Sequence, residues 1–454
     1  MEQQQAARRL RVGVGVALAA ACLVQFVAGI ALLGLQADGA YCLRVLLSRQ
    51  GFACIDPARR TVQALLEAPT LGAVALGVRD LPTAGAIFSL SLQLMPILLT
   101  ALACSLAPSG QRRLMLLPVF AYFAGASSVA SIGMNEGPTA TAFFWTLFFA
   151  LLTVPPRAGA LALLVLGAAA ALFAHEVMAL LAPALVWAAW RRARGARTGA
   201  ARTVFRGLAV WFVIVMIAQW AFVAWPHNVA NRDGFLTQTL ALKFLASANG
   251  VNVPAVLGLL AACGLAATWR WPRAGFAVAV CFAGIALALT GAAMAWDGWF
   301  LAPSAQYYAR NLPALLSVPL AVLAAATIER PGMSWPRAGG ILATLAAATL
   351  GFQLIQIAAW ADSVAAFRAA LHGPPALVAW EDAVAATPAP RRAALLRADW
   401  GWTMPDLSIV LSEDGHVRRL IANPRGRGWQ PWDPSNQAAW PTSALFRVDL
   451  PRAP

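Results

Sequence analysis

The chain has 454 residues, 60% of them hydrophobic and only 12% charged, and its mean hydropathy is +0.66. Soluble domains carry roughly 25% charged residues, so these values exclude an ordinary soluble fold and predict an all-α polytopic membrane protein. The net charge of +15 rests on arginine, since Lys243 is the single lysine. In a membrane protein such an excess records topology and contact with anionic lipid. No aromatic-interleaved basic stretch indicates nucleic-acid binding.

Runs of apolar residues predict eleven transmembrane helices, because crossing the hydrocarbon core takes about 20 such residues. The first run follows a basic patch and has no cleavage site before a polar region, which predicts a retained span and not a removed signal peptide. The predicted spans are residues 12–35, 83–107, 114–133, 139–155, 158–175, 177–190, 207–225, 251–269, 274–296, 312–328 and 338–360.

Arginines gather at alternate ends of these spans, which is the positive-inside pattern. Only Glu2 and Glu329 share that side with them. The pattern predicts a cytoplasmic N-terminus, an odd number of spans predicts an external C-terminus, and together they predict a multi-pass protein of the cell inner membrane. The arginines concerned are Arg8, Arg9, Arg11, Arg112, Arg113, Arg157, Arg191, Arg192, Arg194, Arg197, Arg202, Arg206, Arg270, Arg273, Arg330 and Arg337.

The chain divides into a transmembrane bundle, residues 1–360, and an external cap domain, residues 361–454. The first external loop, 36–82, is expected to hold two interfacial helices, one opening at Asp38 and ending near Gly51, the next opening at Asp56 and Pro57. The cap is rich in tryptophan and proline and is predicted to be a small α+β domain. Within it, 407–411 and 416–421 flank an Asp-Gly turn and predict a β-hairpin.

Cysteines are few. Cys42 and Cys54 fall in the first external loop, and their spacing is compatible with a disulfide between them. The other four cysteines lie in apolar spans, where a thiol behaves as a small hydrophobe. No cysteine or histidine spacing resembles a metal site.

No Asp, Glu, Lys or Arg lies in the middle of a predicted span. The polar residues there are amides such as Gln25, Gln93, Gln219 and Gln353. Ion-coupled transporters usually carry ionisable groups near the midplane. Their absence from this sequence favours a site at the outer face.

Asp38 is the leading catalytic candidate. A carboxylate held near apolar surface can act as a general base toward an acceptor hydroxyl. The competing interpretation makes Asp38 the N-cap of the helix that follows, worth about 1 kcal/mol.

Glu136 and the pair His175–Glu176 are candidates for orienting a substrate. Acids at helix starts also suit the helix dipole, so these residues could simply mark where spans leave the membrane. A metal site is the weaker interpretation for His175–Glu176, because neighbouring helical positions point in different directions.

Arg310 is the candidate for binding a phosphate, since a guanidinium grips phosphate bidentately and an outer-facing arginine departs from the positive-inside trend. The alternative is snorkelling toward lipid headgroups. Tyr308 beside it, and Tyr41 and Arg44 in the first external loop, are further substrate-binding candidates.

These features together resemble the GT-C membrane glycosyltransferases, which include protein O-mannosyltransferases and lipid A aminoarabinose transferases. One span, a long external loop with the early Asp38, many further spans and an outer cap carry the resemblance. The stretch Tyr307-Tyr308-Ala309-Arg310-Asn311-Leu312-Pro313 is similar to an Arg/Tyr-then-Pro segment of that superfamily. Where the family commonly has paired acids, Asp38 is followed by Gly39.

The resemblance implies a polyprenyl-phosphate sugar as donor and Asp38 as the catalytic acid of the first loop. It predicts transfer of a sugar to an acceptor at the outer face, with membrane lipid and the polyprenyl-phosphate donor as partners. A divalent metal stays open as a cofactor, as does the oligomeric state. The alternatives are a transporter or lipid flippase, and a non-catalytic membrane subunit that binds a partner through its cap.

Overall fold

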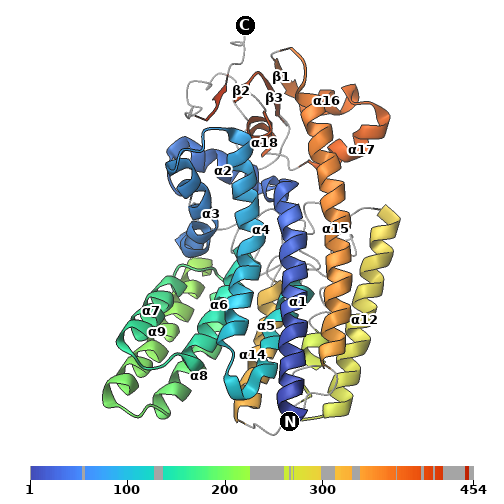
Figure 1. Cartoon of the computed structure of the whole chain (residues 1–454). Coiled ribbons are helices and arrows are strands. Elements are labelled where there is room, and N and C mark those ends of the chain that lie inside the picture. The colour runs from blue at the N-terminus through green and yellow to red at the C-terminus, as the bar shows by residue number, and fades with distance from the viewer. Residues whose placement is uncertain are drawn as a thin grey trace.

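The computed structural model describes residues 2–53, 57–126, 136–224, 260–264, 267–268, 270–297, 312–329, 338–374, 376–399, 403–412, 415–422 and 445–448. Long helices stand side by side in a bundle, and a small cap of short helices and strands covers the end opposite the N-terminus (Figure 1).

Four helices are long and apolar enough to cross a membrane: α1 (Glu2–Ile30), α4 (Leu81–Leu106), α9 (Gly199–Ala224) and α15 (Ala338–Leu371). Helix α1 packs against both α4 and α15. The large apolar side chains Val210, Ile214 and Ile217 recur at helical spacing on α9 and are exposed. An exposed apolar stripe of this kind is what a lipid-facing helix presents.

The remaining bundle helices are α5 (Leu116–Ala126), α6 (Glu136–Thr153), α7 (Ala158–Ala171), α8 (Met178–Arg194), α12 (Pro272–Asp297) and α14 (Leu312–Glu329). The 14 residues of α7 extend only about 21 Å, less than the roughly 30 Å hydrocarbon core. The predicted span 251–269 lies mostly outside the described residues. Four of the eleven predicted spans are therefore long apolar helices in the structure, and the full number of eleven stays a prediction.

The segment 36–82, predicted to be the first external loop, forms two helices, as the sequence predicts: α2 (Asp38–Arg49) and α3 (Arg60–Ala75). Short 3-10 turns introduce them, η1 (Leu33–Leu35) before α2 and η2 (Pro57–Arg59) before α3, and a third, η3 (Ser109–Met115), links α4 to α5. Helix α3 packs on α4 and on α6. The loop thus lies over the end of the bundle beneath the cap (Figure 1).

The cap contains α16 (Trp380–Ala386), α17 (Ala389–Arg397), α18 (Met404–Val410) and the strands β1 (Ala376–Ala379), β2 (His416–Val417), β3 (Arg419–Ala422) and β4 (Arg447–Val448). Both strand pairs are parallel, β1 with β3 and β2 with β4. Helix α15 continues through residue 360 and carries β1 directly after its end.

The predicted hairpin is wrong in its first arm, because residues 404–410 form α18. Pro405 stands in the first turn of the helix, where its fixed φ and missing N–H are tolerated. Ser408 fixes the helix against β3, since its hydroxyl donates to the Met404 carbonyl and accepts from the Ile421 amide. The strand-forming residues instead pair with distant partners, which local sequence does not reveal.

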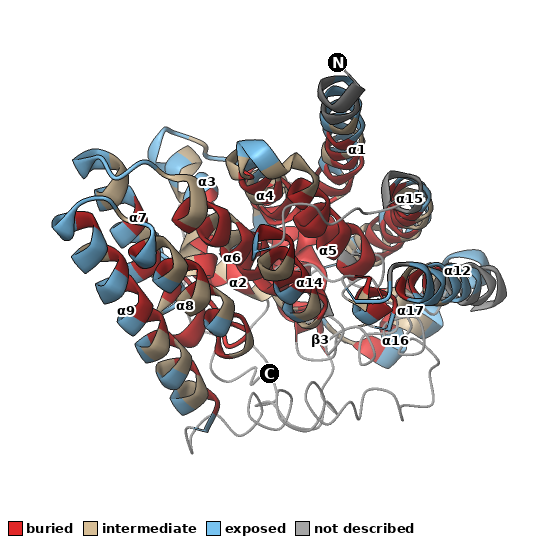
Figure 2. Cartoon of the chain, turned by 90° about the horizontal axis from the view of Figure 1, so that it is seen from below, coloured by how far each residue is buried: buried red, intermediate tan, exposed pale blue. Residues whose placement is uncertain are grey.

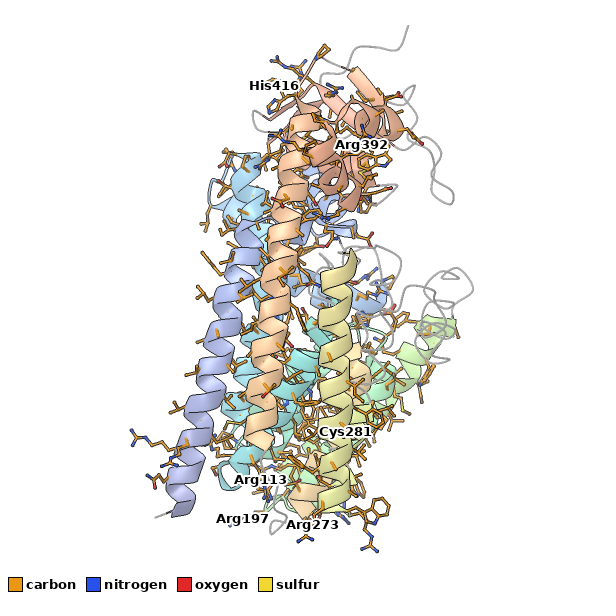
Figure 3. The ribbon with its side chains drawn as sticks, turned by 90° about the vertical axis from the view of Figure 1, so that its right-hand side faces the viewer. Arg113, Arg197, Arg273, Cys281, Arg392 and His416 are labelled. Atoms are coloured by element: carbon orange, nitrogen blue, oxygen red, sulfur yellow. The ribbon has the colours of Figure 1, made fainter. Side chains whose placement is uncertain are left out.

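Buried residues face the interior of the bundle, while α7, α9 and α12 expose their outer sides (Figure 2). Arg113, Arg197 and Arg273 lie at the end of the bundle where the N-terminus is found, and His416 and Arg392 lie at the opposite, cap end (Figure 3). At the arginine-rich end, Arg191 Nε donates to Glu329 Oε1 over 2.9 Å. The predicted separation of the basic end from the cap end agrees with this arrangement.

Candidate functional site

A strained turn leads the chain from α1 into Asp38. Leu32 has φ 62°, and Ala37 has φ 54° with ψ −125°. A residue with a side chain rarely adopts either conformation, and such strain, costing about 1–3 kcal/mol per residue, clusters at functional sites. The turn is also tightly packed, because a Cβ on Gly39 would lie 1.8 Å from the Gly34 carbonyl oxygen. Only glycine therefore fits directly after Asp38.

The turn is anchored to α4 by a buried hydrogen bond, in which the Gly34 amide donates to Ser89 Oγ over 2.8 Å. Asp38 is the first residue of α2, and Ala37 occupies the N-cap position. The N-cap interpretation of Asp38 is therefore wrong, in contrast to Asp80, whose side chain accepts from the Thr83 amide and caps α4. Helix α2 begins one residue earlier than the capping pattern suggests, because the strained turn ends at Ala37.

A buried ion cluster lies where α3, α6 and the turn between α7 and α8 meet. Arg59 contacts Glu176 through Nε, 2.9 Å from Oε2, and through Nη2, 2.8 Å from Oε1. Its Nη1 donates to Glu136 Oε2 over 3.0 Å, and Gln63 Nε2 donates to Glu136 Oε1 over 2.8 Å. Arg59, Gln63, Glu136 and Glu176 are all buried. One guanidinium thus holds two carboxylates from distant parts of the sequence.

The charges of this cluster act strongly on its acids. Burial alone would raise the pKa of Glu176, but the adjacent Arg59 charge, with that of His175, lowers it well below the usual range. Glu67, one turn after Gln63 on α3, has no such cation. Burial, with a smaller effect from Glu136, raises the pKa of Glu67 to about 7, although its carboxylate accepts a 2.7 Å hydrogen bond from the Ala53 amide.

His175 is buried beside Glu176 and can use the same ring nitrogen in two ways. Nδ1 lies 3.1 Å from Glu176 Oε2 and 3.2 Å from the Val177 backbone nitrogen. A protonated Nδ1 donates to the carboxylate, whereas an unprotonated Nδ1 accepts from the amide. The two predicted residues His175 and Glu176 therefore do point at one another, because they lie in the turn before α8 and not within a helix.

Cys42 connects Asp38 to this cluster. It is a free, buried thiol on α2, and Cys54 lies outside the described residues. Burial first, and then the negative charges of Asp38, Glu136, Glu67 and Asp406, raise the pKa of the Cys42 thiol. These acids come from four different elements, α2, α6, α3 and α18, so charges from distant parts of the sequence act on one thiol.

The cap is joined to α2 by an ion pair between Arg44 and Asp406 of α18. The Arg44 guanidinium also lies over the Tyr41 ring, 5.3 Å from its centroid. Burial raises the pKa of Asp406 and that of Tyr41, and the Arg44 charge opposes both increases. Of the two predicted substrate-binding residues, Arg44 thus contacts the cap and Tyr41 packs against the Arg44 guanidinium.

Two predicted residues, Arg310 and Tyr308, lie outside the described residues, so their place relative to Asp38 stays a prediction. Within the described part of the chain, no group of three or more His, Cys, Asp or Glu side chains could hold a metal ion.

Sequence reasoning missed Gln63 and Glu67, and it offered Arg59 only as a weaker candidate for binding an anion or for snorkelling toward lipid headgroups. The buried face of α3 includes Val62, Gln63, Leu66, Glu67 and Thr70, so polar side chains point inward with the apolar ones. The signal was available, since Gln63 and Glu67 are spaced by four residues on one face of α3, and Arg59 stands four residues before Gln63.

Comparison with known proteins adds no relative: no family model, no curated protein and no solved structure matches this chain.

Proposed function

We propose that this protein is a membrane glycosyltransferase of the GT-C kind, which moves a sugar from a polyprenyl-phosphate carrier to an acceptor at the outer face of the inner membrane. The observation that supports it most is the approach to Asp38. A strained and tightly packed turn places this acid at the start of α2, beside buried acids and beneath a docked cap. Strain of this kind is maintained where geometry matters more than stability.

In this mechanism Asp38 is the general base. It takes the proton of the acceptor hydroxyl while that oxygen forms a bond to C1 of the sugar. The bond between C1 and the phosphate oxygen breaks, and its electron pair leaves with the polyprenyl phosphate. Arg310 would neutralise the charge that develops on the leaving phosphate.

Glu136, His175 and Glu176 act in this proposal as positioning residues. Both carboxylates are already engaged by Arg59, so their first effect is to fix α3 and α6 around the site. Glu67 is the better second candidate for proton transfer, because a carboxyl with a pKa of about 7 can both give and accept a proton near neutral pH.

The test is the variant Asp38→Asn, purified in lipid nanodiscs and supplied with a panel of radiolabelled polyprenyl-phosphate sugars and a membrane extract as acceptor. We expect release of polyprenyl phosphate to fall at least about 100-fold, the usual contribution of a general base. The melting temperature should stay close to that of the unsubstituted protein.

Asp80→Asn is the matched control. Asp80 is an exposed acid on the same external loop, and Asn caps a helix about as well as Asp, so transfer should be unchanged. Full transfer by a folded Asp38→Asn protein would refute the mechanism.

A transporter or flippase is the second candidate, and one observation favours it. The amide atoms of Gln356 and the indole nitrogen of Trp360 are buried on α15 without a hydrogen-bond partner in the described structure. Polar atoms inside the bundle could line a route for a polar headgroup. Movement of a fluorescent polyprenyl-phosphate lipid across proteoliposomes, unaffected by Asp38→Asn, would support this function instead.

A further inference from the structure

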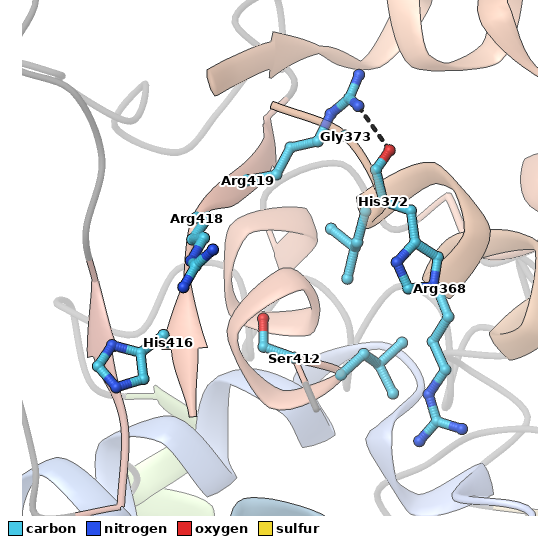
Figure 4. Close-up of a pocket in the computed structure, with 9 residues that line it drawn as sticks. Arg368, His372, Gly373, Ser412, His416, Arg418 and Arg419 are labelled. Carbon is cyan, nitrogen blue, oxygen red and sulfur yellow. Dashed lines mark hydrogen bonds between the residues drawn. The ribbon is translucent and has the colours of Figure 1, made fainter. Parts of the chain in front are cut away.

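A cavity of about 260 Å³ lies in the cap, where the end of α15 meets α18 and the strands. This volume holds far more than one water molecule. Figure 4 shows the side chains around it, which come from segments far apart in the sequence. The lining residues are Arg368, Leu371, His372, Gly373, Leu411, Ser412, His416, Arg418 and Arg419.

The described lining residues carry three arginines and two histidines and no carboxylate. Three fixed positive charges around one cavity repel each other unless an anion lies between them. Glu413 and Asp414 follow Ser412 in the sequence and lie outside the described residues.

Two of the arginines have a side-chain nitrogen without a hydrogen-bond partner. The Nε atoms of Arg368 and Arg419 are buried and have no hydrogen-bond partner in the described structure. Arg419 Nη1 donates to the His372 carbonyl over 2.9 Å, which fixes its direction (Figure 4). A buried donor without a partner costs about 1–3 kcal/mol, so the fold holds both guanidinium groups beside this cavity at a cost.

The backbone is also adapted to this arginine. Gly373 has φ +148°, and a Cβ at this position would lie 2.1 Å from Arg419 Nη1. The glycine thus leaves the space in which the guanidinium lies. Gly373→Ala should displace Arg419 without removing any charge.

The cavity stands at or beyond the lipid headgroups. Asp362 is the first charged residue of α15, and Arg368 follows six residues later, about 9 Å further along the helix. A headgroup layer adds only roughly 5–8 Å to each side of the hydrocarbon core. The cavity therefore faces the aqueous side of the membrane.

We propose that this cavity is a phosphate-binding site that takes the phosphate group of a soluble compound. Guanidinium groups are the side chains best suited to grip phosphate oxygens with two parallel hydrogen bonds. The His372 ring would provide a further polar contact, whereas the Ser412 hydroxyl already donates to the Ser408 carbonyl over 2.8 Å. The site goes beyond the proposed function and does not depend on it, since it lies in the cap and shares no residue with the Asp38 region.

The experiment measures binding of inorganic phosphate by calorimetry to the full protein in nanodiscs of phosphatidylcholine, with chloride at equal ionic strength as reference. Phosphate should bind, and the double variant Arg368→Gln with Arg419→Gln should weaken it at least about tenfold. Gly373→Ala, which keeps every charge, should weaken it as well.

Arg391→Gln is the matched control, because Arg391 is an exposed cap arginine outside the cavity. The Arg391→Gln protein should bind phosphate with the same affinity as the unsubstituted protein. Unchanged binding by a double variant with a normal melting temperature would overturn the proposal. Equal binding of chloride and phosphate would do so too. Loss of phosphate binding in nanodiscs of phosphatidylglycerol would assign the cavity to lipid headgroups and overturn the soluble source.

Discussion

Arg59 sits between two carboxylates, Glu136 and Glu176, that are separated by 40 positions in the sequence and lie on different segments of the bundle. Such a cluster adds little net stability when complete, since desolvation of the charges offsets much of their attraction. Its effect becomes large when one partner is removed, because an uncompensated charge is then left in a low-dielectric interior. The cluster therefore specifies how α3 and α6 fit together more than it stabilises them.

Arg59→Leu should lower the free energy of unfolding by roughly 3–5 kcal/mol, because two buried acids lose their cation. Thermal unfolding in detergent measures this loss of stability. The control is Arg60→Leu, at the neighbouring exposed position, which should have little effect. Adding Glu136→Gln and Glu176→Gln to Arg59→Leu should restore part of the loss. Equal effects of the Arg59 and Arg60 substitutions would contradict the buried cluster.

Glu67 makes stability depend on pH. Its pKa is about 7 in the folded chain against an ordinary value of 4.5, so between these values the folded state binds more protons than the unfolded state. The contribution is fully present below about pH 4.5 and is lost as pH rises through 7, a change of roughly 3 kcal/mol.

Glu67→Gln should remove this part of the dependence while keeping an acceptor for the Ala53 amide. Melting temperatures recorded from pH 5 to pH 8 should fall less steeply for the variant than for the unsubstituted protein. Parallel curves would show that Glu67 is not buried as described.

At the scale of one element, α15 carries a polar stripe on its buried face. Thr349, Gln353, Gln356, Trp360 and Ser363 fall within an arc of about 80° at 100° per residue, and all five are buried. The Tyr122 hydroxyl of α5 lies against the amides of Gln25 and Gln353, so the stripe faces α1 and α5. The sequence identified single amides, but only the packing shows that they share a seam.

Gln356→Leu should raise the melting temperature, because this amide has buried atoms without a partner at a cost of about 1–3 kcal/mol. Thr349→Val is the control, since the Thr349 hydroxyl donates to the Phe123 carbonyl and its loss should lower the melting temperature. A lower melting temperature for Gln356→Leu would show that the amide holds water or ligand.

At the scale of the whole molecule, the basic end and the cap lie at opposite ends of the bundle (Figure 3). Both the positive-inside pattern and the extension of α15 into the cap support an orientation with the cap outside. The Asp38 region and the cap cavity would then face the same compartment.

Cysteine labelling tests the orientation. In right-side-out membrane vesicles, Arg391→Cys in the cap should react with a membrane-impermeant maleimide, and Arg197→Cys at the basic end should react only after the vesicles are opened. The unsubstituted chain gives the background from its native cysteines. Labelling of Arg197→Cys in closed vesicles would reverse the assigned topology.

Local sequence was enough to predict the long apolar helices of the bundle, the two helices within residues 36–82, and the division between a basic end and a cap end. These follow from local runs of apolar residues and from charge, which act over a few neighbouring positions. It also named Glu136, His175 and Glu176 as candidates, but separately.

Tertiary packing was needed to show that Glu136 and Glu176 meet at Arg59, that Asp38 follows a strained turn and not a cap, and that residues 404–410 are helical. It also decided which arginines of the cap surround a cavity. Each of these outcomes depends on contacts between segments tens to hundreds of positions apart, and the free energy of such contacts comes from burial and charge pairing that no local pattern records.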